Sequence, residues 1–488
     1  MPPSHLAYFV SDVVDTFDMR PFYAPYLRDG RRNSPYDPRM MLKVLIYAYA
    51  TGVFSSGKIV RRIEDSVAFR VLAAGNHPSH RTICAFRKRH LEDFRALFVH
   101  VVRVACGAKM VRFGTLSIDG MKVRANASKR KAMSFGRMLL EKEKIKQEIS
   151  ALLLQASRQD AAEDADYSID VRGDELPEAL SSPEKRSKSI QAVLDELAAE
   201  DLEAELARRQ ERLAVVEAAE ADLRARQRED NDRKAYTPDE SAQEPKDTAQ
   251  SNFTDPESRI MKTSQEGFQQ CYTVQTVVDD TAQRIVETRV KNRATDQGLL
   301  VPMVDAVVQT HEAVPEVVLA DAGYCNESDL TALENRGIDA YVAIGRRRAG
   351  KTVTAGTRPA TARMQAKLGT PIGCTQYARR KWLSEAPHGW IKEVLHFRRF
   401  GVRGLAKVRG EWDLVCLSLN LRRLFGLQMA CRHQTGQKSR PLAGFIATIA
   451  GSRVPMARSL PIILLGMIAL LGIHAATAPP GKSYGADS

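Results

Sequence analysis

The sequence predicts an α/β core that is interrupted by a long helical insertion and preceded by an all-α, helix-turn-helix-like domain. Three observations carry this prediction. Short capped helical segments come first, a long stretch of charged helical sequence follows, and strand and helix patterns then alternate. The expected parts are a helical domain over residues 1–110, a core over 111–128 and 251–427, an insertion over 129–250 and a tail over 428–488.

The N-terminal domain has clear helix start signals. Asp37 before a proline predicts the start of a buried helix, and Ser79 predicts the start of a basic one. Between them, one helix is expected from Ser55 or Ser56 to a stop at Gly75. Short helices that end in a basic one resemble a helix-turn-helix arrangement, although a solvated basic face is the alternative. The side chains expected to face outward, as candidates for DNA contact, are His80, Arg81, Arg87, Lys88 and Arg89.

Residues 129–250 differ sharply in charge from the rest of the chain. They carry 21 basic and 29 acidic side chains, whereas the remaining residues carry 51 basic and 30 acidic ones. Apolar residues recur in the insertion at three- and four-residue spacing, which predicts two antiparallel helices in a coiled-coil-like hairpin. The net charge of +21 outside it favours a polyanionic partner, nucleic acid above all. A surface charge that only keeps the protein soluble is the alternative.

The core reads as strand, insertion, and then strand, strand, helix, strand, helix, strand. An apolar strand pattern surrounds Asp119, and after the insertion "QCYTVQTVVD" and "RIVETRVK" alternate as the two strands of a hairpin. A helix is expected to start at Thr295, a short buried strand to end before Asp321, and a capped helix to end at Gly337. Alternation of this kind over one sheet indicates an α/β domain.

Three carboxylates stand where a site could form. Asp119 and Asp321 each follow an apolar run and precede a small residue, and Glu385 is expected to open a helix that also presents Lys381 and Lys392. A hairpin turn at Asp119 and a surface ion pair at Glu385 are the ordinary alternatives. Gathered together, the carboxylates would need cations, and their oxygens suit Mg²⁺ or Mn²⁺. Two such ions serve an in-line phosphoryl transfer. Asp119 would then sit in a strand to hold metal, with Gly120 leaving room for backbone approach.

The cysteines and the two terminal segments indicate which kind of cellular compartment the protein occupies. The seven cysteines are scattered, odd in number and without a C-x-x-C pair, which argues for a reducing compartment and against a disulfide framework or a cysteine zinc site. The start of the sequence lacks the layout of a secretory signal. The apolar segment 460–473 is shorter than a membrane span, so a packing helix is favoured over a membrane anchor.

Several blocks of the sequence resemble the DDE transposases of bacterial insertion sequences. The match begins with the helical stretch "YDPRMMLKVLIYAYATGVF" and continues through "SIDGMKVRANASK", "NFTDPESRIMKTSQEGFQQCYTVQTVVD", "VVLADAGY" and "YARRKWLSEAPHGWIKEVLHFRRFGVRGLAKVRG". Their fixed order from about Asp37 to Leu424 is more specific than any one motif. Met121 departs from the threonine that the family tends to have. His388 and Trp390 stand where an aromatic residue and a glutamine are expected.

The resemblance implies a ribonuclease H-like core with Asp119, Asp321 and Glu385 as catalytic residues that bind two Mg²⁺ or Mn²⁺ ions. It implies a transposase that cuts phosphodiester bonds at the element's ends and joins the freed 3′ hydroxyls to target DNA. The expected partners are double-stranded DNA and at least a second copy of the chain, with no small-molecule substrate, at the nucleoid of the bacterial cytoplasm. The residues expected to contact DNA near the site are Lys122, Tyr377, Arg380, Lys381, Lys392, Arg398, Arg399, Arg403, Lys407 and Arg409.

Three other functions stay open at this point. A catalytically inactive DNA-binding relic or repressor of the element would use only the basic helices. A ribonuclease H-like nuclease without strand transfer would share the carboxylates but need no specific terminal sequence. A membrane-tethered protein depends on segment 460–473 alone and is not favoured.

Overall fold

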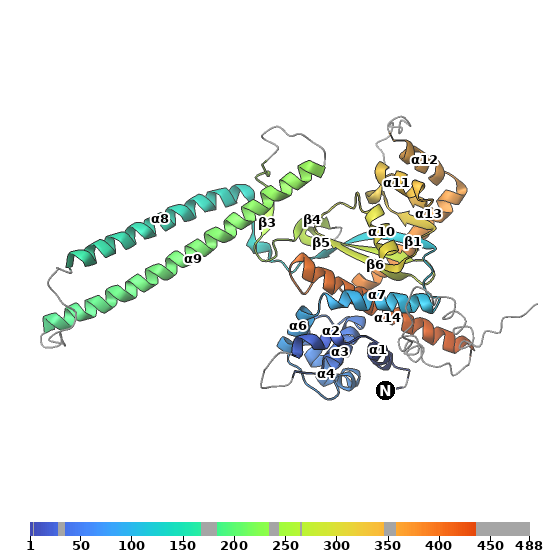
Figure 1. Ribbon diagram of the computed structural model, residues 1–488, viewed down its shortest axis with the longest axis horizontal. Coiled ribbons are helices and arrows are strands. Elements are labelled where there is room, and N and C mark those ends of the chain that lie inside the picture. Colours follow the sequence, from blue (N-terminus) through green and yellow to red (C-terminus); the bar gives the residue numbers. More distant parts are fainter. Residues whose placement is uncertain are drawn as a thin grey trace, which may run out of the picture. The chain divides into compact units, whose positions relative to one another are not determined.

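A computed structural model describes most of the chain, which divides into two compact units (Figure 1). One unit is Met1–Asn126 together with Met261–Ser488, and the other is Ala127–Ile260. The predicted apolar segment 460–473 lies outside the described residues. None of the described helices is long and apolar enough to span a lipid bilayer. The residues that the structure describes are 1–2, 4–27, 35–166, 183–233, 244–263, 266–345 and 358–435.

The N-terminal region is helical, as predicted, and both predicted caps are present. Asp37 accepts a hydrogen bond from the Arg39 backbone N–H, and Ser79 accepts one from Thr82. The single helix expected from Ser55 to Gly75 is wrong, because Ser66 has an extended backbone that splits it in two. The helices are α1 (Leu6–Asp15), α2 (Arg20–Tyr23), η1 (Ala24–Tyr26), α3 (Pro38–Ala50), α4 (Ser56–Asp65), α5 (Val67–Leu72), α6 (His80–Arg89) and α7 (Asp93–Gly107).

A mixed sheet forms the centre of the first unit. Its strands are β1 (Thr115–Arg124), β4 (Arg259–Thr263), β5 (Gly267–Asp279), β6 (Arg284–Lys291), β7 (Val317–Ala320) and β8 (Asp339–Val342). Strand β5 pairs antiparallel with β1 and β6, and β7 lies parallel between β1 and β8. Asp119 and Gly120 pair with β5 inside an unbroken strand, so the alternative of a turn at this point is wrong.

The helices around the sheet differ from the prediction at two starts. Helix α10 begins at Leu300 rather than at Thr295, because Gly298 takes a positive φ of 72° that a helix does not continue. Helix α13 begins at Pro371 behind a Thr370 cap, so Glu385 lies inside the helix and does not open it. The elements are α10 (Leu300–His311), η5 (Ala322–Tyr324), α11 (Glu327–Asn335), α12 (Pro359–Leu368), α13 (Pro371–Gly389), the π-helical turn η6 (Trp390–Val394) and α14 (Leu405–Thr435).

Helix α14 joins the N-terminal helices to the sheet. It packs against α1, α3 and α7 and also against β6, and Figure 1 shows α7 and α14 side by side. Its middle is buried on every side, with Trp412, Leu417 and Leu421 fully buried. Because a helix that is buried all round has no solvent face, α14 forms the centre of a core shared by both regions.

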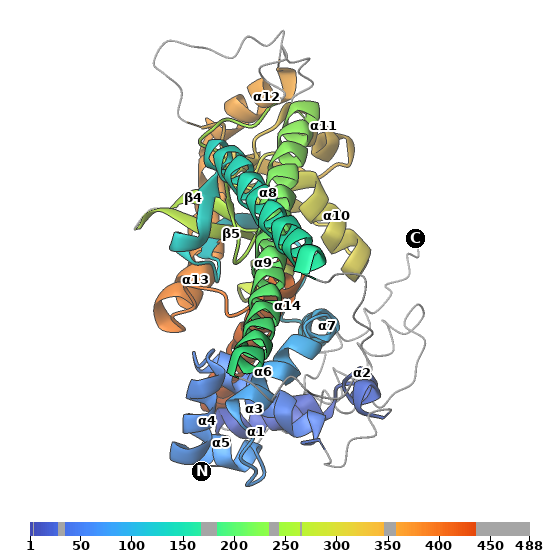
Figure 2. The ribbon, with the colours of Figure 1, turned by 90° about the vertical axis from the view of Figure 1, so that its left-hand side faces the viewer.

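The second unit is built around two helices, α8 (Phe135–Asp166) and α9 (Pro183–Arg233), that run alongside each other (Figure 1). Figure 2 shows the same pair foreshortened, with α8 in front of α9. Ion pairs link Glu141 to Arg212 and Glu148 to Arg209, so the helices run antiparallel, as predicted. A small apolar cluster closes the open end of the hairpin beside the short strands β2 (Ala132–Ser134) and β3 (Gln250–Asn252). It contains Phe135, Met138, Ile145, Val216, Ala219 and Leu223.

Asp413, which α14 buries against β6, should make folding pH-dependent. Burial raises its pKa to about 6, even though Arg95 lies 3.7 Å away and Thr288 donates a hydrogen bond to it. Because the folded state binds this proton more tightly than the unfolded state, the stabilisation is complete below about pH 4 and is lost as the pH rises through about 6. Asp413→Asn, which stays neutral, should therefore gain on the order of 2–3 kcal/mol relative to the native protein between about pH 4 and pH 7.

Urea unfolding of both proteins across this pH range measures the difference. Asp305→Asn is the control, because Asp305 is exposed and paired with Arg336. A difference for Asp413→Asn that does not change with pH would show that Asp413 is ionised throughout.

Candidate active site

The register between β1 and β7 places two aspartates next to each other. The strands are parallel, and Ile118 pairs with Ala320. The next residue is Asp119 on one strand and Asp321 on the other. Asp119 continues within β1, whereas β7 ends and Asp321 caps the short η5 by accepting a hydrogen bond from the Gly323 N–H. Both carboxylates therefore lie where β7 leaves the sheet, at an edge where α/β folds place their sites.

Helix α13 lies across this part of the sheet and brings further polar groups to Asp119. The hydroxyls of Ser117 and Ser384 are hydrogen-bonded to each other between the strand and the helix. His388 Nδ1 lies 3.5 Å from Asp119 Oδ2, and its Nε2 is hydrogen-bonded to the Thr276 hydroxyl at 2.8 Å. The imidazole thus bridges β5 and the carboxylate, and it is buried.

Arg380 connects the first aspartate to the glutamate. Its guanidinium lies 3.7 Å from Asp119 Oδ1 and 4.0 Å from Glu385 Oε1. The Tyr377 ring lies one turn earlier on α13, with its centre 5.9 Å from the guanidinium carbon. Arg380 is half-buried and Asp119 is buried, so the charge of Arg380 acts on Asp119 with little screening by water.

The carboxylates differ in how readily they ionise. Burial alone would raise the pKa of Asp119, but the hydrogen bond with His388 and the charge of Arg380 outweigh it and lower the pKa. Burial raises the pKa of Asp321, and the nearby charge of Asp119 adds to this effect. Asp119 is therefore the firmly ionised member of the pair, and Asp321 is the one whose charge a cation would stabilise most.

A fourth carboxylate, Asp296, belongs to the same group. It accepts a hydrogen bond from Gln275 Nε2 at 2.5 Å, and Gln275 in turn accepts one from the Tyr324 hydroxyl. Burial raises the pKa of Asp296, and the charges of Asp321 and Asp119 add to it. The sequence offered one signal for this residue, an aspartate two residues before a glycine in a segment that was expected to start a helix.

Gly120 makes room for this side-chain network rather than for another backbone. A Cβ at Gly120 would lie 2.7 Å from Gln275 Nε2 and 2.9 Å from Asp296 Oδ1. The prediction that a backbone approaches closely at Gly120 is therefore wrong. The two side chains fill the space that the missing Cβ leaves.

A pocket of about 520 Å³ opens beside Asp119 and Glu385 and is lined by three lysines. They are Lys122 on β1, Lys262 on β4 and Lys392 in the π-helical turn η6. Lys122 Nζ donates a hydrogen bond to the Lys262 backbone oxygen at 2.8 Å, so the Lys122 ammonium lies beside the main chain of β4. Burial lowers the pKa of Lys392. Sequence reasoning missed Lys262, because nothing in its local pattern distinguishes it from other exposed lysines.

The other residues that were expected to contact DNA fall into two groups, with one exception. His80, Arg81, Lys88 and Arg89 are exposed on α6, Lys381 is exposed on α13, and Lys407 and Arg409 are exposed on α14. Arg398 pairs with Glu393, whereas Arg399 and Arg403 donate hydrogen bonds to Asn126 at the end of β1. Arg87 stands apart from both groups. The prediction that its side chain faces outward is wrong, because it is buried.

Arg87 is buried, and the contacts of its guanidinium lie inside the protein. It donates hydrogen bonds to the Tyr49 hydroxyl at 3.0 Å and to the Phe54 carbonyl at 2.8 Å, and it lies 3.5 Å from Glu411. Helical periodicity places it next to Phe86, on the side that packs against α3 and α14. Its guanidinium is therefore not available to a partner.

The donor chemistry of the site fits a hard divalent cation. Carboxylate oxygens of Asp119, Asp321 and Glu385 are the ligands that such ions prefer, and the charge of Asp119 helps to raise the pKa of Asp321. Among the described residues, no three His, Cys, Asp or Glu side chains stand close enough together to hold an ion. Arg380 is the present counter-charge of Asp119, so an ion bound there would share or take over that part.

Two family models match the chain. Residues 1–89 match the family described as Transposase domain (DUF772), and residues 234–421 match the family described as Transposase DDE domain. No curated protein and no solved structure matches the chain significantly. The DDE domain implies a ribonuclease H-like fold, and the mixed sheet with its flanking helices is compatible with that fold.

Proposed function

The chain belongs to the DDE transposases of the insertion-sequence type, and we propose that it cuts phosphodiester bonds at the ends of its element and transfers the 3′ hydroxyl ends to target DNA. The observation that supports this most is the register of β1 and β7, which sets Asp119 beside Asp321, while Glu385 on α13 lines the same pocket as Asp119. DDE transposases generally use divalent metal ions, and a family that acts on DNA binds DNA.

The core of the proposal is a ribonuclease H-like fold. Three antiparallel strands, β6, β5 and β1, are followed by β7 and β8, which run parallel to β1. Helix α13 then crosses β1, β5, β7 and β8. This arrangement supplies an aspartate from the central strand, one from the neighbouring strand end and a glutamate from the covering helix.

We assign the metal ligands to Asp119, Asp321 and Glu385. Two Mg²⁺ or Mn²⁺ ions held there would supply the positive charge that activates an attacking oxygen and stabilises a leaving one. His388 and Arg380 keep Asp119 ionised, and Gln275 and Tyr324 hold Asp296 against the same group. Lys122, Lys262 and Lys392 would hold the phosphate backbone beside the carboxylates.

Basic side chains of the N-terminal domain and of the core would contact the DNA. Arg81, Lys88 and Arg89 on α6 would hold DNA through the N-terminal domain, with Arg398, Arg399 and Arg403 extending the contact from the core. Two ends must be brought together, so two copies of the chain would form the active complex. A protein that acts on bacterial DNA in this way would work at the nucleoid in the cytoplasm.

A cleavage and joining assay tests the function. The substrate is DNA that carries the sequences flanking the gene, with Mg²⁺, and the intact protein is compared with Asp119→Ala and Glu385→Ala. We expect the intact protein to nick at a defined end and to join that end to target DNA, whereas both variants bind DNA and do neither. Equal binding without cutting by all three would identify an inactive DNA-binding relic, and cutting without joining or end preference would identify a nuclease.

Gly120→Ala should impair cleavage more than folding. The added methyl group must displace Gln275 or Asp296, and misplacement of groups beside a reacting centre by a fraction of an ångström costs about tenfold or more in rate. The loss of stability should stay near 1–2 kcal/mol, because side chains rather than backbone give way. Gly114→Ala is the matched control, since nothing lies within 4 Å of a Cβ there. Equal rates for the two variants would contradict the assigned role of Gly120.

A further inference from the structure

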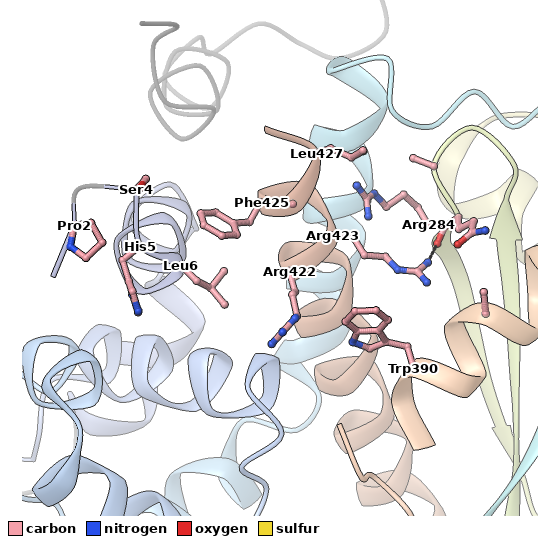
Figure 3. A pocket seen from close by; sticks show the side chains of 14 residues that line it. Pro2, Ser4, His5, Leu6, Arg284, Trp390, Arg422, Arg423, Phe425 and Leu427 are labelled. Atoms are coloured by element: carbon pink, nitrogen blue, oxygen red, sulfur yellow. Dashed lines mark hydrogen bonds between the residues drawn. The ribbon is translucent and has the colours of Figure 1, made fainter. Parts of the chain in front are cut away.

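A second, larger pocket is rich in arginine and lies away from the carboxylates. It has a volume of about 950 Å³ and opens between the start of α1, the start of β6 and the end of α14 (Figure 3). Arg284 comes from β6, and Arg422 and Arg423 come from α14. None of the described residues that line the pocket is acidic. The wall is otherwise mostly apolar and aromatic, with Leu6, Trp390, Phe425 and Leu427.

Arg284 is a buried charge without a partner of its own. The residue is 1% exposed, and its Nε and Nη2 atoms have no hydrogen-bond partner. Burial lowers its pKa to about 9, and the charge of Arg423 adds to this effect. The negative charge of Asp279 raises the pKa of Arg284 in part. The Asp279 carboxylate, however, already accepts backbone hydrogen bonds from Arg112, Phe113 and Thr281. The positive charge is therefore poorly compensated.

The two arginines of α14 are better placed to touch a ligand. Arg423 donates a hydrogen bond to the Gln283 carbonyl, and its other N–H groups bond to none of the described residues. Burial lowers its pKa to about 10. Arg422 donates to the Ala50 carbonyl at 2.7 Å and lies over the Trp390 ring, with 5.8 Å between the guanidinium carbon and the ring centre. Figure 3 shows Trp390 beside these two arginines.

We propose that this pocket binds the phosphate group of a nucleotide. Arg423 and Arg422 would contact the phosphate oxygens, for which the guanidinium fork is well suited, and the charge of Arg284 would stabilise the same anion from beneath. The aromatic and apolar wall would take the attached base. The volume suits a ligand of this size and is far larger than a lone phosphate needs. The nucleotide comes either from a DNA strand or from free mononucleotide, which offer the same chemistry.

Thermal unfolding of the full chain tests this proposal without any need for DNA cleavage. The probes are inorganic phosphate, deoxyadenosine monophosphate and a DNA dinucleotide with one internal phosphodiester, each at an ionic strength held constant with sodium chloride. A ligand that binds only the folded protein raises the Tm with concentration. We expect one or both nucleotides to raise it at lower concentration than inorganic phosphate does. Protection by the dinucleotide alone identifies a DNA strand as the source, and protection by the monophosphate alone identifies free nucleotide.

Arginine variants locate the effect. Arg284→Met should unfold at a higher temperature than the native chain without ligand, because an uncompensated buried charge is removed, and it should respond less to the probes. Arg423→Met should weaken binding by about tenfold or more. Arg336→Met is the control, since Arg336 is exposed and paired with Asp305. The Asp119→Ala variant should respond like the native chain, which separates this pocket from the carboxylate site.

Two results would overturn the assignment. One is a Tm of the native chain that no probe changes. The other is an equal response of Arg423→Met and the Arg336→Met control. If Arg284→Met lacks a cooperative transition, Arg423→Met and Trp390→Ala decide the question, because both side chains are partly exposed and neither is central to the core.

Discussion

Replacing Asp321 by cysteine is expected to abolish DNA cleavage in Mg²⁺ and to restore part of it in Mn²⁺. The thiolate is a poor ligand for Mg²⁺ and a better one for the softer Mn²⁺, so a change of ion can compensate only for a residue that touches the ion. The loss in Mg²⁺ should be about 10³-fold or more, the size expected when a group that stabilises the transition state directly is removed. Single-turnover cleavage of end-containing DNA in each ion measures it.

DNA binding and folding must stay unchanged for this result to bear on catalysis. Asp321 is half-buried beyond the end of β7, and the backbone N–H groups of Gly323 and Tyr324 donate hydrogen bonds to it. Asp339→Cys is the matched control, because Asp339 begins the neighbouring strand β8 at the opposite edge of the sheet. Loss of cleavage in both ions, with normal activity of the control, would leave Asp321 essential but not a metal ligand.

Replacing Glu411 by alanine is expected to destabilise the protein by about 3–5 kcal/mol, the cost of leaving a buried charge without its partner. Glu411 is completely buried on α14. It accepts hydrogen bonds from the Tyr49 hydroxyl at 2.8 Å and from the Gly401 N–H at 2.7 Å, and Arg87 lies 3.5 Å away. Without the carboxylate, the Arg87 charge and the Gly401 N–H stay buried and unpaired. Chemical unfolding of the full chain measures the change.

A double-mutant cycle separates the ion pair from the other contacts of Glu411. Glu411→Gln and Arg87→Met are measured singly and together, and the double variant should lose less than the sum of the two single losses. Glu334→Ala is the control, because its pair with Arg363 is exposed and worth at most about 1 kcal/mol. If Arg87→Met left stability intact but weakened DNA binding, Arg87 would be a DNA contact after all.

Local sequence patterns predicted most of the helices and strands, because caps and side-chain alternation act over a few residues. Asp37 and Ser79 cap helices as expected, and the alternating runs after residue 267 form the hairpin of β5 and β6. Errors arose where a longer-range contact overrode the local signal. The Thr295 start lost to the turn at Gly298, which leaves Asp296 free to reach Gln275.

Burial of charged side chains was the least predictable feature. Arg87 begins a basic run and has the same local signal as Lys88 and Arg89, yet its partners Tyr49 and Glu411 lie on α3 and α14. Arg284 reads as an ordinary strand-flanking residue, but α14 covers it. No local pattern records which distant helix will pack on a given side chain.

The sequence by itself determined the order of the elements, the charge contrast between the insertion and the rest, and the blocks that resemble the DDE transposases, a family that the domain matches then established. The tertiary structure decided which side chains lie next to one another at the site. Asp119 lies beside Asp321 because β1 and β7 pair in one particular parallel register, and Glu385 lines the same pocket as Asp119 because α13 starts at Pro371 and crosses the sheet. A strand's periodicity fixes which face a side chain takes, but only pairing between distant segments fixes its neighbours.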